Sequence, residues 1–101
     1  MEETKQDNIV FVGSKSVRTY SESVDIQFEE KNSETVILKS RGRFILSAIN
    51  VAEFVIRRSE GKLKISDIKI GSEKFKAKDL DKEIYVSNIE ITISKNWKEG
   101  E

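Results

Sequence analysis

The sequence predicts a two-layer α+β domain with the element order βαβαββ, in which two helices cover one face of a four-stranded mixed sheet. Two observations lead to this class: apolar runs of strand length alternate with stretches of helical period, and two strand patterns then follow each other directly. The strand-like and helix-like stretches come in the order 9–12, 17–28, 35–39, 44–56, 63–70 and 84–94. A chain of 101 residues is just large enough for one domain with a core.

The first predicted strand, Ile9–Val12, is an apolar run that ends at Gly13 and that we expect to be buried. Ser16 is placed to cap the helix that follows. One face of that helix would hold Val17, Tyr20, Val24 and Phe28. The other positions are mostly polar and acidic, which predicts a solvent-exposed outer face.

The middle of the chain, Thr35–Ile56, predicts a strand that passes through a basic turn into a helix. Residues 36–38 form a continuous apolar run, so we expect both faces of the strand to be covered at least in part. The turn Ser40–Arg43 then leads into a helix that begins near Phe44. The hydrophobic period changes from that of a buried strand to 3.6 residues at this point.

The second helix carries more apolar surface than one sheet can cover. A core stripe at helical spacing is formed by Ile45, Ala48, Ile49, Ala52, Val55 and Ile56. An adjoining flank holds Phe44, Val51 and Phe54, so apolar residues span about 200° of the circumference. Either another helix or a second subunit must cover the remainder. In so short a chain a subunit is the more economical choice, which predicts a dimer through this flank.

The last third of the chain predicts two strands joined by a charged hairpin arm. Gly61 is the expected left-handed terminator of the second helix. The alternation within 63–70 changes phase near Ser66, which indicates a β-bulge. The strand Ile84–Ser94 has isoleucines at 89, 91 and 93 on one face and polar residues at 90, 92 and 94 on the other. The arm between the two strands, Glu73–Glu83, is rich in lysine.

The composition excludes several classes of protein. The chain has no cysteine and no histidine, which excludes disulfides, thiolate or imidazole catalysis and the usual zinc sites. We therefore expect no enzyme, metal, cofactor or small-molecule substrate. No apolar run is long enough to cross a membrane and the first residues are unlike a signal peptide, so we expect a cytoplasmic location. Residues 1–7 are predicted as a disordered lead-in and 96–101 as a tail around a domain at 8–95.

Charge is polarised along the chain although 18 basic and 18 acidic residues cancel. If the loop after the first strand lies beside the turn after the second, as in neighbouring parallel strands, basic groups converge on one edge of the sheet. The candidate nucleic-acid contacts are Lys15, Arg18, Lys39, Arg41, Gly42, Arg43, Lys74, Lys76 and Lys78. Gly42 would mark a helix start, where unpaired N–H groups and the helix dipole attract a phosphate. The alternative is a solvated basic turn whose glycine only relieves a backbone constraint.

Four segments together resemble the Alba family of archaeal chromatin and RNA-binding proteins. They are NIVFVGSKSV, TVILKSRGRFILSAINVAE, IKIGSEK and VSNIEITISK, and they span most of 8–95. The most specific is Lys39–Arg43 in front of a helix that contains Ala48 and Glu53. The resemblance implies a homodimer with the fold also seen in the C-terminal domain of translation initiation factor three. It also implies hairpin arms along the minor groove and central basic loops on the nucleic-acid backbone.

The chain departs from the family pattern in the loop after the first strand, near the end of the second helix, and in the hairpin arm, where lysines mixed with acidic residues replace the usual arginines. The family loop after the first strand usually reads Gly-Lys-Lys-Pro, whereas this chain has Gly-Ser-Lys-Ser, so Ser14 replaces a lysine and only Lys15 carries over. Ser59 stands near the end of the second helix, where the family often has an aromatic residue for contacts between dimers. Weak and weakly cooperative binding is therefore expected.

The sequence favours a non-enzymatic, largely sequence-independent DNA- or RNA-binding protein, associated with the chromosome, whose affinity comes from phosphate contacts. The alternative is a subunit that joins a protein or ribonucleoprotein assembly and binds nucleic acid weakly by itself. Either a homodimer or a heterodimer with an Alba paralogue fits this pattern. No aromatic platform for stacking bases is apparent, so the sequence does not distinguish DNA from RNA.

Overall fold

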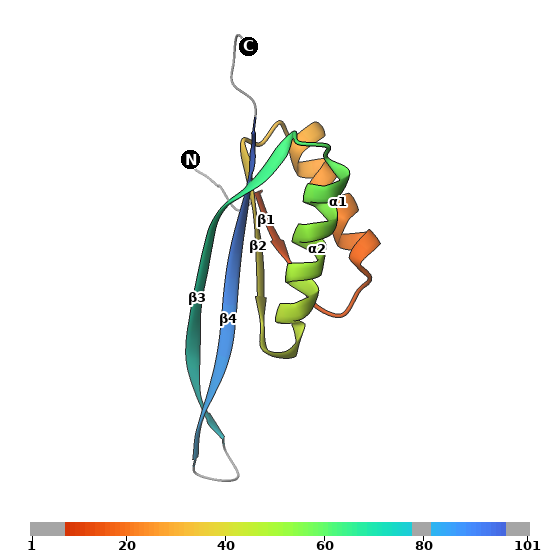
Figure 1. Cartoon of the computed structure of the whole chain (residues 1–101). Coiled ribbons are helices and arrows are strands. Elements are labelled where there is room, and N and C mark those ends of the chain that lie inside the picture. Colours follow the sequence, from red (N-terminus) through yellow and green to blue (C-terminus); the bar gives the residue numbers. More distant parts are fainter. Residues whose placement is uncertain (1–7, 78–81, 97–101) are drawn as a thin grey trace.

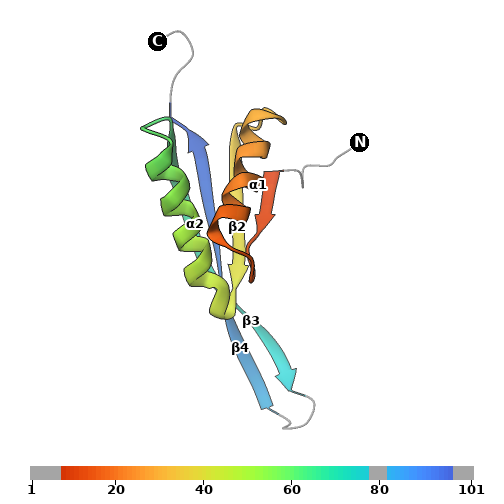
Figure 2. The same cartoon turned by 90° about the vertical axis from the view of Figure 1, so that its right-hand side faces the viewer.

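The computed structural model describes residues 8–77 and 82–96, and it shows a four-stranded sheet with two helices on one face (Figures 1 and 2). The elements are β1 (Ile9–Phe11), α1 (Val17–Glu29), β2 (Thr35–Arg41), a 3₁₀ turn (Gly42–Phe44), α2 (Ile45–Arg58), β3 (Leu63–Ala77) and β4 (Lys82–Lys95). The predicted βαβαββ order and α+β class are confirmed. Within the described part of the chain, no helix is long and apolar enough to cross a membrane.

The sheet is mixed, with the strand order β1-β2-β4-β3. β1 runs parallel to β2, while β4 is antiparallel to both β2 and β3. One row of paired residues crosses the whole sheet as Val10, Leu38, Ile91 and Ile68. The first three are buried beneath the helices but Ile68 is 54% exposed, so the core covers β1, β2 and β4 and ends before β3.

The face of the sheet opposite the helices is open. In β1, Val10 and the following Val12 are buried, whereas Phe11 between them is 69% exposed. The prediction of a buried first strand is therefore wrong for Phe11, because the strand alternates between a covered and an open face. In β2, Val36 and Leu38 are buried and Ile37 is half-buried, so partial cover of both faces is confirmed.

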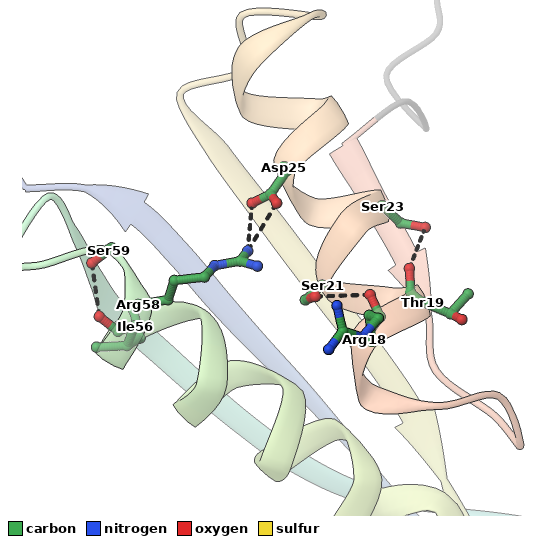
Figure 3. A network of polar contacts seen from close by, with 8 residues as sticks. All are labelled: Arg18, Thr19, Ser21, Ser23, Asp25, Ile56, Arg58 and Ser59. Atoms are coloured by element: carbon green, nitrogen blue, oxygen red, sulfur yellow. Dashed lines mark hydrogen bonds and ion pairs between the residues drawn. The ribbon is translucent and has the colours of Figure 1, made fainter.

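α1 starts where the sequence predicts. The Ser16 hydroxyl accepts a hydrogen bond from the Thr19 N–H at 3.2 Å and caps the helix. The residues that α1 buries are Tyr20, Ser21, Val24 and Phe28. Ser21 satisfies its hydroxyl by donating to the Arg18 carbonyl oxygen at 2.8 Å (Figure 3). A small polar residue inside the apolar face is thus accommodated at a helix–helix contact without an unpaired group.

The core stripe of α2 is rotated relative to the prediction. Its buried residues are Ala48, Val51, Ala52 and Val55, while Ile49 is 36% exposed. The prediction that Val51 belongs to an exposed dimer flank is wrong, because α1 packs against that side of α2 and completes the core. Arg58 of α2 donates to both carboxylate oxygens of Asp25 in α1, at 2.7 and 2.9 Å (Figure 3). The guanidinium of Arg58 also covers the Phe54 ring, 5.0 Å from its centroid.

The end of α2 and the entry into β3 carry two special backbone features. Gly61 is left-handed (φ 88°), as predicted, and the preceding Glu60 is left-handed as well (φ 55°). The register between β3 and β4 shifts between Ile65 and Asp67, which confirms the predicted bulge at Ser66. Beyond the bulge, β3 and β4 continue past the sheet as a two-stranded arm (Figure 1).

Candidate functional site

The ends of β1 and β2 are tied together at the basic end of the molecule. The Val12 N–H donates to the Lys39 carbonyl oxygen at 2.8 Å. The buried hydroxyl of Ser40 donates back to the Val12 carbonyl oxygen, also at 2.8 Å. Because the two strands are parallel, the loop after β1 and the turn after β2 lie at the same end of the domain, and the arm extends beyond that end (Figures 1 and 2). The predicted convergence of the two loops is confirmed.

One buried tyrosine holds the loop that carries Lys15. The Tyr20 hydroxyl oxygen accepts hydrogen bonds from the N–H groups of Gly13 at 2.8 Å and Lys15 at 3.1 Å. Its ring is buried beneath α1, so the loop backbone is anchored to the core. The side chains of Ser14 and Lys15 are exposed, as is Arg18 in the first turn of α1. The loop backbone is therefore anchored to the core, and the side chain of Lys15 is exposed to solvent.

The turn after β2 changes the direction of the chain through Gly42. Its φ of +63° is left-handed, which is unfavourable for a side-chain-bearing residue and explains the glycine. Arg43 follows in the 3₁₀ turn, with its guanidinium 4.8 Å from the centroid of the Phe44 ring. Arg43 is exposed and forms no ion pair among the described residues. Arg43 therefore lies at the start of the helix and has no carboxylate partner among the described residues.

Lys39 and Arg41 lie on the open face of the sheet, away from the helices. β2 continues to Arg41, two residues beyond the predicted end, and Leu38 and Ser40 occupy the covered face. Lys39 pairs with Glu90 at 3.5 Å, and Arg41 pairs with Glu73 at 3.1 Å. The expected cluster of three cations around one helix start is therefore divided, with only Arg43 in the helical turn.

The arm adds further charges of both signs. Lys74 pairs with Glu83 across the arm at 3.6 Å, and Lys76 lies opposite Glu83 in the strand register. The Arg41 guanidinium reaches the arm as well and lies 5.7 Å from the centroid of the Phe75 ring. Lys78 falls outside the described residues. The arm thus begins as a mixed-charge ribbon that contacts the end of β2.

Sequence reasoning missed several residues beside the predicted cations. Glu73 accepts from Arg41 and also from the side-chain amide of Asn88, the latter at 3.2 Å. Exposed Phe11 and Phe75 flank the same region of the open face. The strand register pairs Arg41 with Asn88, and that pairing depends on the sheet order rather than on any local pattern. The continuous apolar run at 9–12 carries no local signal for the exposure of Phe11.

The fold and this end of the molecule define a small α+β domain that presents basic side chains from two adjacent loops and a hairpin arm. The family model for Alba matches residues 8–72, and the chain belongs to the Alba family. The matched segment includes both loops and the bulge and ends at the beginning of the arm.

Curated relatives and solved structures agree with this assignment. The chain is 42% identical over 89 residues to the DNA/RNA-binding protein Alba of Methanococcus maripaludis, an alignment that covers 88% of this chain and 99% of the relative. It is similar in structure to Alba from Thermoplasma volcanium, with a TM-score of 0.75, 34% identity and coverage of 86% and 99% of the two chains.

A more distant structure shows the same fold. ALBA1 from Trypanosoma brucei matches with a TM-score of 0.69 at 17% identity, over 92% of this chain and 73% of that one. The Methanococcus relative is named a DNA/RNA-binding protein and the Thermoplasma structure is named Alba, which agrees with the prediction of a non-enzymatic protein.

Proposed function

We propose that this protein is a non-enzymatic, largely sequence-independent DNA- or RNA-binding protein that contacts phosphates through the basic end of the domain. The observation that carries the proposal is the parallel pairing of β1 with β2, which brings the loop of Lys15 and the turn of Arg43 to one end beside the arm (Figure 2). Relatives named DNA/RNA-binding protein Alba support this function. Chromosome association would follow from it.

Phosphate binding by this end rests first on two uncompensated cations. Lys15 and Arg43 are exposed and have no ion pair within residues 8–77 and 82–96. Arg43 offers a planar fork of N–H donors that fits a phosphate, and its stacking on Phe44 limits its conformations. Arg18 and the arm lysines Lys74 and Lys76 would extend the contacts. Such contacts position the protein on the backbone without reading bases.

The same geometry also supports the second candidate function, an assembly subunit that binds nucleic acid weakly by itself. Lys39, Arg41 and Lys74 each have a carboxylate partner within 3.6 Å. A phosphate must displace or share these partners, which lowers the gain from each contact. Titration of the purified protein with DNA and with structured RNA, with and without a paralogous chain, separates the two candidates.

A dimer is part of the proposal, through a surface that differs from the predicted flank. Exposed apolar side chains lie along the β3 edge on the helix side of the sheet and on the neighbouring part of α2. We call this the α2–β3 surface, and its residues are Leu46, Ile49, Ile65, Ile68 and Ile70, which are 36% to 81% exposed. So much apolar area on one edge is unusual for a monomer. Phe44 and Phe54 are half-buried in the protomer, and their part in a dimer stays a prediction.

The test of the proposed function is a comparison of two arginine substitutions with the same change in charge. Arg43→Ala should weaken binding to unrelated duplex sequences and RNAs by a similar factor. It should also make the plot of log K against log salt shallower by about 0.9 for each lost phosphate contact. Arg57→Ala removes an exposed arginine near the C-terminal end of α2 and is the matched control, which should behave as the unmodified protein. Equal losses from both substitutions, or a changed sequence preference with an intact slope, would refute the phosphate assignment.

A further inference from the structure

A cleft lies at the basic end, where β1 and β2 finish. Its lining includes Phe11, Lys39, Arg41, Phe44, Asn88 and Glu90, and its volume is about 480 Å³. This volume falls within the range of about 300–1,000 Å³ that is typical of small-molecule sites. The cleft therefore has room for a group the size of a nucleobase, and its walls come from all four strands and the turn before α2.

Two aromatic rings line this cleft. Phe11 is 69% exposed, although its neighbours Val10 and Val12 are buried, so its ring stands on the open face of the sheet. Phe44 contributes from the 3₁₀ turn and carries the Arg43 guanidinium 4.8 Å from its ring centroid. Phe11, an exposed aromatic ring on a sheet beside cations, is thus suited to stacking with an unpaired base.

The polar groups of the cleft suit the edge of a base better than a phosphate. Lys39 is balanced by Glu90, and Arg41 by Glu73, which also accepts from Asn88. Two carboxylates beside two cations leave the cleft without net positive charge, so it would not attract a phosphate strongly. A base edge carries both donors and acceptors, and these groups supply both. The adjacent phosphates would meet Arg43 and Lys15 outside the cleft.

We propose that this cleft binds an unpaired nucleobase of single-stranded nucleic acid, with the base stacked on Phe11. The inference rests on the proposed nucleic-acid binding and names a ligand class for that end of the molecule. A base inside a duplex is stacked and paired, so it does not reach the cleft. Duplexes therefore bind through phosphate contacts alone, while single strands gain an additional contact. The protein accordingly discriminates between single-stranded and double-stranded ligands through Phe11.

The experiment compares a short mixed-sequence single-stranded RNA with the duplex formed by that RNA and its complement. Phe11→Ala should weaken single-strand binding by roughly 5- to 150-fold, the range expected for one lost stacking contact. Duplex affinity should not change, and Phe11→Tyr should retain single-strand binding. Ile26→Ala, an exposed apolar residue on α1, is the control and should alter neither affinity. The fluorescence of a 2-aminopurine base in the strand should change on binding to the unmodified protein, and should change less with Phe11→Ala.

Each other outcome overturns the inference. An equal loss of affinity for both ligands would mean that Phe11→Ala destabilises the fold. A urea unfolding curve of the Phe11→Ala variant would show this independently. No loss on either ligand would exclude a base contact. A change in self-association with unchanged RNA binding would assign Phe11 to an interface between copies. If the unmodified protein bound neither ligand, the proposed function itself would fail, and the inference would fail with it.

Discussion

Glu73 is the carboxylate partner of the Arg41 guanidinium. Its two carboxylate oxygens accept separately, one from the Arg41 guanidinium at 3.1 Å and one from the Asn88 amide at 3.2 Å. Arg41 is held between this carboxylate and the Phe75 ring. A residue that appears from its sequence to be a free cation is thus compensated in the folded protein, and its contribution to binding depends on the removal of its partner.

We therefore expect Glu73→Gln to strengthen binding to duplex DNA. The substitution removes a negative charge and weakens the hold on Arg41, and surface ion pairs of this kind are worth about 0.2–1 kcal/mol, or roughly up to fivefold in affinity. Glu22→Gln, an exposed acid on α1, is the control with the same charge change and should have a smaller effect. Weaker binding by Glu73→Gln would show instead that Glu73 positions Arg41 for its ligand.

The two principal errors at the residue level have different physical causes. A run of four apolar residues predicts a buried strand, and it does not tell whether one face of that strand or both are covered. Phe11 is exposed because both helices, α1 and α2, lie on the other face of the sheet. Val51 was assigned to an exposed flank because the sequence does not say on which side of α2 the first helix packs. The Asp25–Arg58 pair shows that side, and it joins residues 33 positions apart. Neither fact is available from local pattern.

At the level of elements, the order and type of the strands and helices were predictable from the sequence. Their ends and the faces on which their side chains lie were less predictable. The change of period at Phe44 located α2, and the phase change in β3 located the bulge at Ser66. The ends were less accurate, since β2 continues to Arg41 and the arm is a direct extension of β3 and β4. Because β2 includes Lys39 and Arg41, the alternation of the strand places both side chains on the open face of the sheet. This explains why the predicted cluster around the helix start was only partly found.

The apolar α2–β3 surface leads to a prediction about assembly. Ile68→Asp should convert the dimer to a monomer, because the charge would be buried without a partner in a desolvated contact. The protomer fold should survive, since the Ile68 side chain is 54% exposed before association. Light scattering at micromolar concentration measures the mass, with Ile26→Asp on α1 as the control that should stay dimeric. A monomeric unmodified protein, or a dimeric Ile68→Asp, would contradict this use of the surface.

At the scale of the whole molecule, the positions of the charged residues matter more than their sum. The net charge is zero, yet Lys15, in the loop after β1, and Arg43, in the turn after β2, lie at the same end of the domain. The departures from the family pattern act at this scale. Ser14 leaves one cation in the loop, and Ser59 caps α2 by donating to the Ile56 carbonyl oxygen at 2.8 Å and accepting from the Leu63 N–H at 3.2 Å. Ser59 thus has a structural role but little apolar area for a contact between dimers.

The salt dependence of binding to long duplex DNA tests the account most directly. If Lys15 and Arg43 of both protomers contact phosphates, four contacts per dimer predict a slope of about −3.6 in log K against log salt. Binding should be weakly cooperative and should be nearly the same for unrelated sequences. A slope near zero, or affinity confined to one sequence, would contradict the claim that this end of the molecule binds the nucleic-acid backbone.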